Sequence, residues 1–255
     1  SLSYELFDIK NKEDHYFESL LKELKVDGFK GVNITYPFKE KAINYADRVN
    51  KGASFIKSAN TLIFQEKTIA ENTDFSGFLR TLDFHFKDNK AEKILVIGGG
   101  GVGRSVLFGL GSLHNKDLYL IETDLIKGNN LVKELLLSNI NCKLIKNNEL
   151  DGMISNFNAI INCTPIGHED FPGCPLGYLE PNKDQWVFDV VYTPAKTQFI
   201  KKAEKVGAKI ISGIDLFIFQ ALDAFILFNN EKVNQKEISE HINFLRQHYF
   251  KDLFN

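Results

Sequence analysis

A run of four glycines, Gly98–Gly101, constrains the fold of this chain more than any other feature of its sequence. It follows the apolar segment "KILVI" and precedes "VGRSVLFGL", whose apolar residues have helical spacing. Gly98, Gly100 and Gly103 form a G-x-G-x-x-G pattern, in which Gly98 permits a tight turn and Gly103 permits close packing of helix and strand. Gly100 or Gly101 lets a pyrophosphate approach the backbone at the helix N-terminus. The context favours a dinucleotide site over a flexible glycine-rich loop.

Two carboxylates end the next apolar segment, "LYLIETD". Glu122 and Asp124 stand where a Rossmann acid is expected, roughly 20 residues beyond the glycines. A carboxylate there accepts hydrogen bonds from the adenosine ribose hydroxyls and repels a 2′-phosphate. Position favours Glu122, with Asp124 in support, although Lys127 could offer a positive charge. We therefore predict NAD rather than NADP; the alternative is a pair of solvated acids at a strand end.

Segments with strand and helix patterns alternate along the whole chain. Before the glycines we expect strands at 4–9 and 31–35, helices at 13–25 and 37–49, and a hairpin or two short strands within 59–74. After a polar stretch at 85–92, apolar strands alternate with amphipathic helices, and the part from residue 214 onwards is mostly helical. This order predicts an α/β protein whose parallel sheet is covered by helices on both faces.

Composition excludes several classes of protein. The 255 residues carry a net charge of −2, so we expect no nucleic-acid partner. Three separated cysteines and six scattered histidines predict neither a disulfide framework nor a metal site, and they favour a reducing, cytoplasmic setting. The apolar segment 214–228 is short and interrupted by polar residues, so we expect no membrane span. We find no signal peptide, and because the sequence does not begin with Met, we expect the protein's start to lie upstream.

Polar side chains gather at the ends of elements in the first third of the chain. Each group has an ordinary explanation as a cap, a turn or a solvated side chain. Together with a dinucleotide site, they suggest a pocket for a hydroxylated substrate. They lie in "GVNITYPFKEK" (Asn33, Thr35, Lys39), "SANTL" (Asn60, Thr61) and "ENTDFSGF" (Asn72, Thr73, Asp74).

These segments resemble the shikimate dehydrogenase family, most of all its NAD-preferring quinate/shikimate branch. Besides the three above, "VIGGGGVG", "INCTPIG", "FDVVYTPAKTQF" and "FQALDAF" occur in the family's order. The resemblance implies two α/β domains with a cleft between them. A substrate-binding domain would comprise 1–86 and 217–255, and a Rossmann-type dinucleotide-binding domain would comprise 87–216. The family's enzymes interconvert shikimate and 3-dehydroshikimate, or quinate and 3-dehydroquinate, in aromatic amino acid biosynthesis.

The resemblance also implies roles for particular residues. Lys39 and Asp74 look like the catalytic pair, and the substrate ligands would be Thr35, Asn60, Tyr192 and Gln220. The cofactor, NAD or NADP, would lie against Gly98, Gly100, Gly101, Val102, Glu122, Asp124, Asn162, Cys163, Thr164 and Pro165, with its nicotinamide near Val191, Gly213 and Leu216. The partner would be the small-molecule substrate, bound by a monomer or homodimer without metal.

Hydride would pass between nicotinamide and a substrate ring carbon, while a proton leaves or reaches the attached oxygen. Lys39 could hold its ammonium on that oxygen and stabilise developing alkoxide charge. General-base work by Lys39 needs a depressed pKa or a water relay, because a bare lysine has a pKa of about 10.4. Asp74 would oppose that depression by stabilising the charged ammonium.

The sequence departs from the family pattern at several places. "YELFDI" matches the family's second strand, so the first strand and its two substrate-gripping serines are expected to be lacking here, and Ser1 and Ser3 stand too close to that strand to replace them. Lys57 and Asp215 occupy positions where glycine is usual, and Leu216 replaces the usual Met. These departures leave open a non-catalytic binding relative. A methylenetetrahydrofolate dehydrogenase-like enzyme is a further alternative, against which "NITYPFK" with "NTD" argues.

Overall fold

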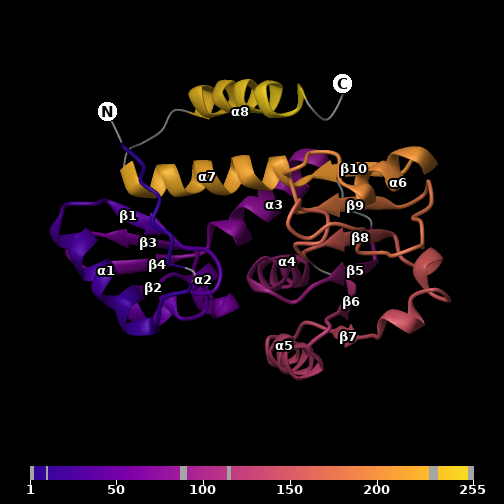
Figure 1. Cartoon of the computed structure of the whole chain (residues 1–255), viewed down its shortest axis with the longest axis horizontal. Helices are drawn as coiled ribbons and strands as arrows, with labels where there is room; N and C mark the ends of the chain where they lie inside the picture. Colours follow the sequence, from indigo (N-terminus) through magenta and orange to yellow (C-terminus); the bar gives the residue numbers. More distant parts are fainter. Residues whose placement is uncertain (1–2, 10, 87–90, 114–115, 230–234, 252–255) are drawn as a thin grey trace. The chain divides into compact units, whose positions relative to one another are not determined.

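The computed structural model describes residues 3–9, 11–86, 91–113, 116–229 and 235–251 (Figure 1). The chain divides into two compact units, residues 1–72 with 227–230 and residues 73–226 with 231–255. We call them unit 1 and unit 2. The domain boundaries expected from the sequence, at 86/87 and 216/217, stay a prediction, and residue 87 lies outside the described residues, as does Ser1.

Unit 1 is built on a four-stranded sheet of order β1-β3-β4-β2. Strands β3 (Thr61–Phe64) and β4 (Thr68–Glu71) form an antiparallel hairpin, which confirms the hairpin predicted within 59–74. β1 (Gly31–Asn33) pairs antiparallel with β3, and β2 (Arg48–Val49) pairs parallel with β4. The antiparallel pairing of β3 and β4 places the start of β3 and the end of β4 at the same end of the sheet.

The helix predicted at 13–25 is present as α1 (Asp14–Val26), and its apolar stripe supplies much of the core of unit 1. Phe17 stacks on Phe38 with ring centroids 4.6 Å apart and meets Tyr45 edge to face at 5.3 Å. Such aromatic pairs add to the free energy gained by burying the rings. α1 therefore packs against the 34–45 segment, which holds several of the predicted site residues.

Two of the predicted elements are wrong. Residues 4–9, all of them described, form no strand, since their alternating pattern meets no neighbouring strand; Leu6 is 91% exposed. Residues 37–49 form turns, a short 3-10 helix (Ala42–Tyr45) and β2 rather than one helix. The amide of Asp47 donates to the carbonyl of Thr68, and its carboxylate accepts from the amide of Thr68. Pairing with β4 therefore competes with and ends helical structure here.

Unit 2 contains a parallel six-stranded sheet of order β10-β9-β8-β5-β6-β7. In chain order the strands are β5 (Lys93–Ile97), β6 (Asp117–Ile121), β7 (Cys142–Leu144), β8 (Ala159–Asn162), β9 (Trp186–Asp189) and β10 (Lys209–Ser212). The chain winds outwards from β5 to β7 and then returns to the other side of β5. This is the Rossmann order, and the reversal between β5 and β8 is where such sheets bind ligands.

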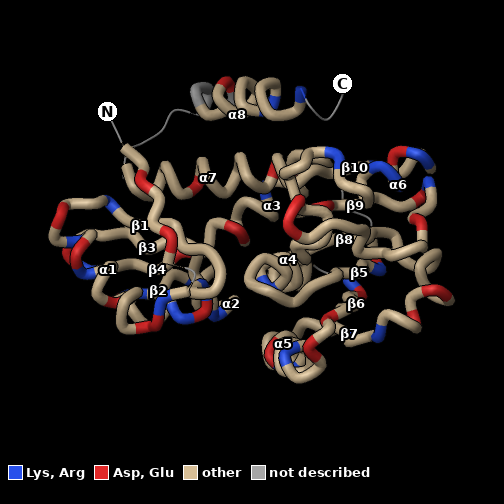
Figure 2. The backbone as a smooth tube through the Cα atoms, in the orientation of Figure 1, with Lys and Arg blue, Asp and Glu red and all other residues tan. Residues whose placement is uncertain are grey.

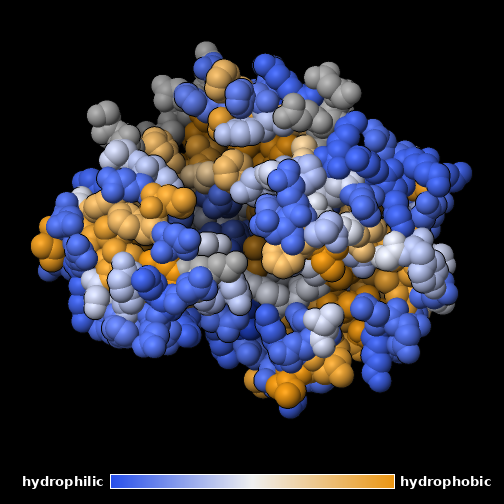
Figure 3. Space-filling view, in the orientation of Figure 1, coloured by the Kyte–Doolittle hydropathy of each residue, from blue (hydrophilic) through white to orange (hydrophobic). Residues whose placement is uncertain are grey.

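Helices cover both faces of this sheet, as the sequence predicts (Figure 1). α4 (Gly101–Ser112) and α5 (Leu125–Leu137) lie on one face, and α6 (Gln198–Val206) lies on the other. The two directions of winding explain the two faces, because parallel crossovers are right-handed. The surface of unit 2 seen in Figure 3 is largely hydrophilic near α6. Lys201 and Glu204 of α6 are exposed.

The remaining helices are α2 (Lys51–Ile56) of unit 1, α3 (Thr73–His85), α7 (Gly213–Asn229) and α8 (Gln235–Tyr249). Short 3-10 helices at Asn147–Glu149 and Ile154–Asn156 complete the regular structure of the described residues. Phe78 of α3 stacks on Phe188 of β9, with centroids 5.8 Å apart, so α3 packs on the parallel sheet. α7 and α8 confirm the predicted helical character of the C-terminal part within its described residues. None of the helices described here combines the length and apolar character that crossing a bilayer requires.

Candidate functional site

The glycine turn has the geometry that its sequence predicts. Gly98 directly follows β5 with a φ of +96°, and its amide donates to the carbonyl of Ile121 at 2.8 Å. A Cβ on Gly103 would stand 1.9 Å from the carbonyl oxygen of Gly98, so only glycine lets α4 start this close to β5. A Cβ on Gly100, in contrast, would meet no atom of the described residues within 4 Å. Space is therefore open over the turn, in front of the first amides of α4.

Glu122 contacts this turn directly. One carboxylate oxygen accepts from the amide of Gly99 at 2.9 Å, and the other accepts from the amide of Asp124 at 3.1 Å. The side chain is half-buried, so part of its surface stays accessible beside the open space. The acid picked out from the sequence thus lies at the glycine turn, although β6 separates the two along the chain.

Asp124 has a structural task that the sequence analysis did not assign. It is the N-cap of α5, and its carboxylate accepts from the amides of Ile126 and Lys127, both at 3.0 Å. N-cap acids satisfy amides that the helix leaves unpaired. A role for Asp124 in binding ribose stays a prediction.

The loop after β8 is tied to the end of β9 by a buried polar network. Asn162 donates to the carboxylate of Asp189 at 2.8 Å and to the carbonyl of Ile166 at 3.0 Å. Its side-chain oxygen accepts from the amide and the hydroxyl of Thr164. This network leaves Cys163 and Thr164 half-buried and Pro165 exposed at the carboxyl edge of the sheet, next to Gly98.

Asp189 is a residue that the sequence analysis missed. It is fully buried and accepts from the hydroxyl of Thr197 at 2.6 Å and the amide of Val191 at 3.1 Å. Burial raises the pKa of this carboxyl to about 6, against the opposing effect of its hydrogen bonds from Thr197, Asn162 and Val191. The signal was present in "WVFDVVY", where an acid ends an otherwise apolar strand.

The residues predicted near the nicotinamide lie at the ends of β9 and β10. A Cβ on Gly213 would stand 2.4 Å from the carbonyl oxygen of Val190, so α7 begins in close contact with the chain that leaves β9. Val191 and Leu216 are buried at 8% and 6% exposure. Together with the glycine turn and the loop after β8, they occupy the carboxyl edge of the sheet. An open turn, helix amides that face it and a neighbouring acid fit a dinucleotide.

Within unit 1, the segments that carry Thr35, Lys39 and Asn60 meet at one place. The amide of Ile34 donates to the carbonyl of Asn60 at 2.7 Å, and the amide of Ala59 donates to the carbonyl of Lys39 at 2.9 Å. Asn60 is buried and accepts from the hydroxyl of Thr61 at 3.0 Å, while Thr35 is exposed. The structure thus brings these three predicted residues together at one end of the sheet of unit 1.

Asp74 and Gln220 lie on two helices of unit 2 that pack closely. A Cβ on Gly77 of α3 would stand 2.8 Å from the amide nitrogen of Gln220 on α7. Asp74 is buried, and the Gln220 side chain donates to the carbonyl of Phe217 at 3.1 Å. The pairing of Asp74 with Lys39 stays a prediction, because the two residues belong to different units.

Tyr192 lines a cavity of about 520 Å³ in unit 2. Its ring stacks on Phe217 with centroids 4.9 Å apart. Burial, and to a lesser extent the neighbouring Tyr249, raise the pKa of the Tyr192 hydroxyl, which therefore stays protonated at neutral pH. The rest of the lining is Thr193, Pro194, Ala195, Lys196, Lys201, Ile214, Phe217 and Tyr249.

The cysteines carry no sign of reactive or ligating thiolates. Burial raises the pKa of the thiols of Cys142, Cys163 and Cys174 above the usual value. Over the described ranges of the chain, no three His, Cys, Asp or Glu side chains are grouped so that they could hold a metal ion.

Comparisons with known proteins agree on one family. The model of the shikimate dehydrogenase substrate binding domain matches residues 1–62. A protein of Clostridium botulinum (strain Loch Maree / Type A3) named shikimate dehydrogenase (NADP(+)) is 32% identical over 228 residues, which are 88% of this chain and 84% of that protein. The protein of that name from Pelagibacter ubique is 32% identical over 92% of this chain and 86% of its own length.

Solved structures show the same relationship. Quinate dehydrogenase from Corynebacterium glutamicum in complex with NAD superposes with a TM-score of 0.82 at 26% identity, covering 94% of this chain and 83% of that one. Shikimate 5-dehydrogenase from Thermus thermophilus in complex with NADP(H) and shikimate gives 0.74 at 26% identity, covering 92% and 85%. Relatives above 30% identity over most of both chains, together with the Rossmann sheet and its glycine turn, show that this chain belongs to the shikimate dehydrogenase family.

Proposed function

We propose that the chain is an NAD(P)-dependent oxidoreductase that acts on shikimate, quinate or both. The observation that carries the proposal is the glycine turn between β5 and α4, open over Gly100 and contacted by Glu122 at the switch point of a Rossmann sheet. Support for the substrate comes from the relatives, which are named shikimate and quinate dehydrogenases.

The chain's own residues would divide the work between binding and proton handling. A bound nicotinamide would accept or supply the hydride. Lys39 would hold its ammonium against the reacting substrate oxygen, stabilising negative charge there and exchanging the proton. Asp74 would orient a substrate hydroxyl or the lysine, and the substrate would be held by Thr35, Asn60, Tyr192 and Gln220.

We further propose that the enzyme prefers NAD to NADP. Glu122 supports this choice, because a carboxylate at the glycine turn accepts from ribose hydroxyls and repels a 2′-phosphate. The quinate dehydrogenase with a TM-score of 0.82 is a complex with NAD. Because relatives are named shikimate dehydrogenase (NADP(+)), NADP is the competing cofactor against which this preference is measured.

A matrix of shikimate and quinate against NAD and NADP tests both proposals, followed through the absorbance of the reduced cofactor. We expect turnover with at least one acid and a higher kcat/KM with NAD. Binding of an acid without turnover in any combination would contradict the catalytic role and favour a non-catalytic relative.

Lys39→Ala tests the catalytic assignment. We expect kcat to fall by roughly 10²–10⁴ with dinucleotide affinity near that of the parent, as for other groups that move a proton. Lys41→Ala is the matched control, since Lys41 is an exposed lysine two residues away that pairs with Asp14 at 2.6 Å. Equal losses in the two variants would remove Lys39 from the mechanism.

A further inference from the structure

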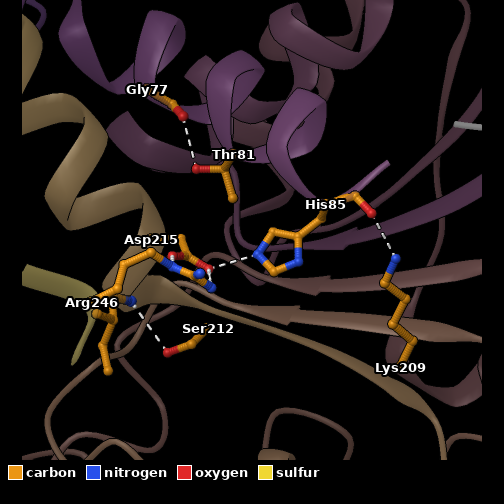
Figure 4. A network of polar contacts seen from close by, with 8 residues as sticks. Gly77, Thr81, His85, Lys209, Ser212, Asp215 and Arg246 are labelled. Atoms are coloured by element: carbon orange, nitrogen blue, oxygen red, sulfur yellow. Dashed lines mark hydrogen bonds and ion pairs between the residues drawn. The ribbon is translucent and has the colours of Figure 1, made fainter. Parts of the chain in front are cut away.

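One buried carboxylate outside the site described above joins three helices of unit 2 (Figure 4). Asp215, in the first turn of α7, has no exposed side-chain surface. It accepts from Nε2 of His85 on α3 at 2.6 Å and from Nε of Arg246 on α8 at 2.7 Å. Because both partners lie on other helices, this single side chain ties α3 and α8 to the start of α7.

The partners of Asp215 are themselves held in place. The Arg246 guanidinium lies 4.3 Å from the ring centroid of Phe84 and 4.8 Å from that of Phe250. The carbonyl of His85 accepts from Lys209 of β10 at 2.8 Å. The Asp215 carboxylate therefore meets the Arg246 cation and the His85 donor, and each of these two residues is held in place by further contacts.

The start of α7 is also where the predicted nicotinamide residues lie. Gly213 packs against the backbone after β9, and Leu216 follows Asp215 directly. The hydroxyl of Ser212 accepts from the amide of Ile214 at 3.2 Å, which fixes the first turn (Figure 4). A movement of Asp215 would therefore move the backbone of Gly213 and Leu216.

α8 is attached to this turn through two kinds of contact. Ile238 and Ile242 of α8 pack with Ile214 and Ile218 of α7 in one apolar cluster. The pair Asp215–Arg246 adds a directional contact to this cluster, because the guanidinium presents fixed donors. Along α7, Asp215 and Asp223 are the charged residues of an otherwise uncharged helix (Figure 2).

We propose that Asp215 is a positioning residue of the dinucleotide site, which transmits the docking of α8, through Arg246, to the turn that carries Gly213 and Leu216. The inference rests on the proposed function, since it places the nicotinamide at that turn. It follows that a substitution of Arg246 on α8, away from the glycine turn, alters the affinity for the dinucleotide. Without the Arg246 cation the buried Asp215 carboxylate keeps the contact with His85 alone, and a buried charge that has lost its cation is unfavourable, which favours displacement of the turn.

The test uses the full chain with Asp215→Asn, Arg246→Met and Arg246→Lys. We expect the first two to weaken dinucleotide binding about tenfold in a calorimetric titration, a coupling typical of linked sites. The KM for the acid substrate at saturating dinucleotide should change less than about twofold. Hydrogen exchange of α8 amides should speed up in both variants, and Arg246→Lys should recover part of each effect by restoring the charge.

Asp223→Asn is the matched control. Asp223 also joins α3 to α7, but it lies two turns further along α7, and its partners Arg80 and Ser76 are both on α3. We expect the variant to leave dinucleotide affinity unchanged. Equal weakening in the two aspartate variants would reduce the effect to general stability and overturn the proposal.

Other outcomes are equally decisive. Parental dinucleotide affinity in a folded Asp215→Asn variant with a loosened α8 would refute the coupling. Weakened affinity without faster exchange in α8 would refute the part played by α8. Should Asp215→Asn fail to fold, Arg246→Met, at a side chain 26% exposed, carries the same test. If the parent protein binds neither dinucleotide, the proposed function fails, and the parent titration shows this separately.

Discussion

Replacing Glu122 with Gln isolates the charge that we hold responsible for cofactor choice. The amide oxygen of Gln can still accept from the amide of Gly99, now 2.9 Å from the carboxylate, so the glycine turn keeps its support. What disappears is the negative charge beside the site of the adenosine ribose.

The expected magnitude follows from Coulomb's law. Two unit charges about 4 Å apart interact by about 4 kcal/mol at an effective dielectric constant of 20. Glu122 is half-exposed, so salt and solvent reduce this to about 1–2 kcal/mol. The ratio of kcat/KM for NADP over that for NAD should therefore rise about 5–30-fold in Glu122→Gln.

The assay compares both cofactors at low and high ionic strength, with parent, Glu122→Gln, Glu122→Ala and Asp124→Ser. The gain in the ratio should shrink in high salt. Glu122→Ala should also lose affinity for both cofactors, because the amide of Gly99 loses its acceptor. Asp124→Ser keeps an N-cap and should change the ratio little. An unchanged ratio in Glu122→Gln would refute the electrostatic argument and return Glu122 to a purely structural role.

Three further outcomes can be measured directly. Gly103→Ala should lower the free energy of unfolding by about 1–3 kcal/mol or more, because its Cβ would overlap the carbonyl of Gly98, whereas Gly100→Ala should leave the melting temperature unchanged and weaken dinucleotide binding. Asp189 has a pKa raised to about 6, so it stabilises the fold below about pH 4 and loses that contribution as pH rises through 6. Urea unfolding from pH 4 to 7 should show Asp189→Asn without this change, which is on the order of 3 kcal/mol in the parent. Lys57 has a left-handed φ of 57°, so Lys57→Gly should raise the free energy of unfolding by about 0.5–1 kcal/mol, and a destabilised variant would contradict this.

The sequence predicted the elements whose structure depends mainly on residues that are neighbours in the chain. The strand–turn–helix around Gly98 follows from apolar periodicity and glycine spacing, and α1 and the β3–β4 hairpin follow from the same kind of pattern. The predicted secondary structure was wrong where the conformation of a segment depends on a partner strand that is distant in the chain. Residues 4–9 have strand alternation without a strand to pair with, and residues 37–49 have helical character that pairing with β4 interrupts.

The same division holds for the candidate site. The sequence singled out Glu122 because ligand chemistry requires an acid at that spacing, and the structure adds its bond to Gly99. It did not reveal the burial of Asp189, which depends on what folding places around that carboxylate. The cap role of Asp124 was missed although it is local, because its carboxylate accepts from the amides two and three residues further on.

The sequence by itself therefore determined the alternation of strands and helices after the glycines, the glycine turn and the family, since these are set by residue type and spacing. The tertiary structure decided which polar groups are buried together. Asp215 appears in the sequence only as an acid in place of a usual glycine, yet folding surrounds it with His85 and Arg246 from helices that lie far away along the chain. A buried charge is tolerated only with such partners, and bringing them together takes the packing of three helices.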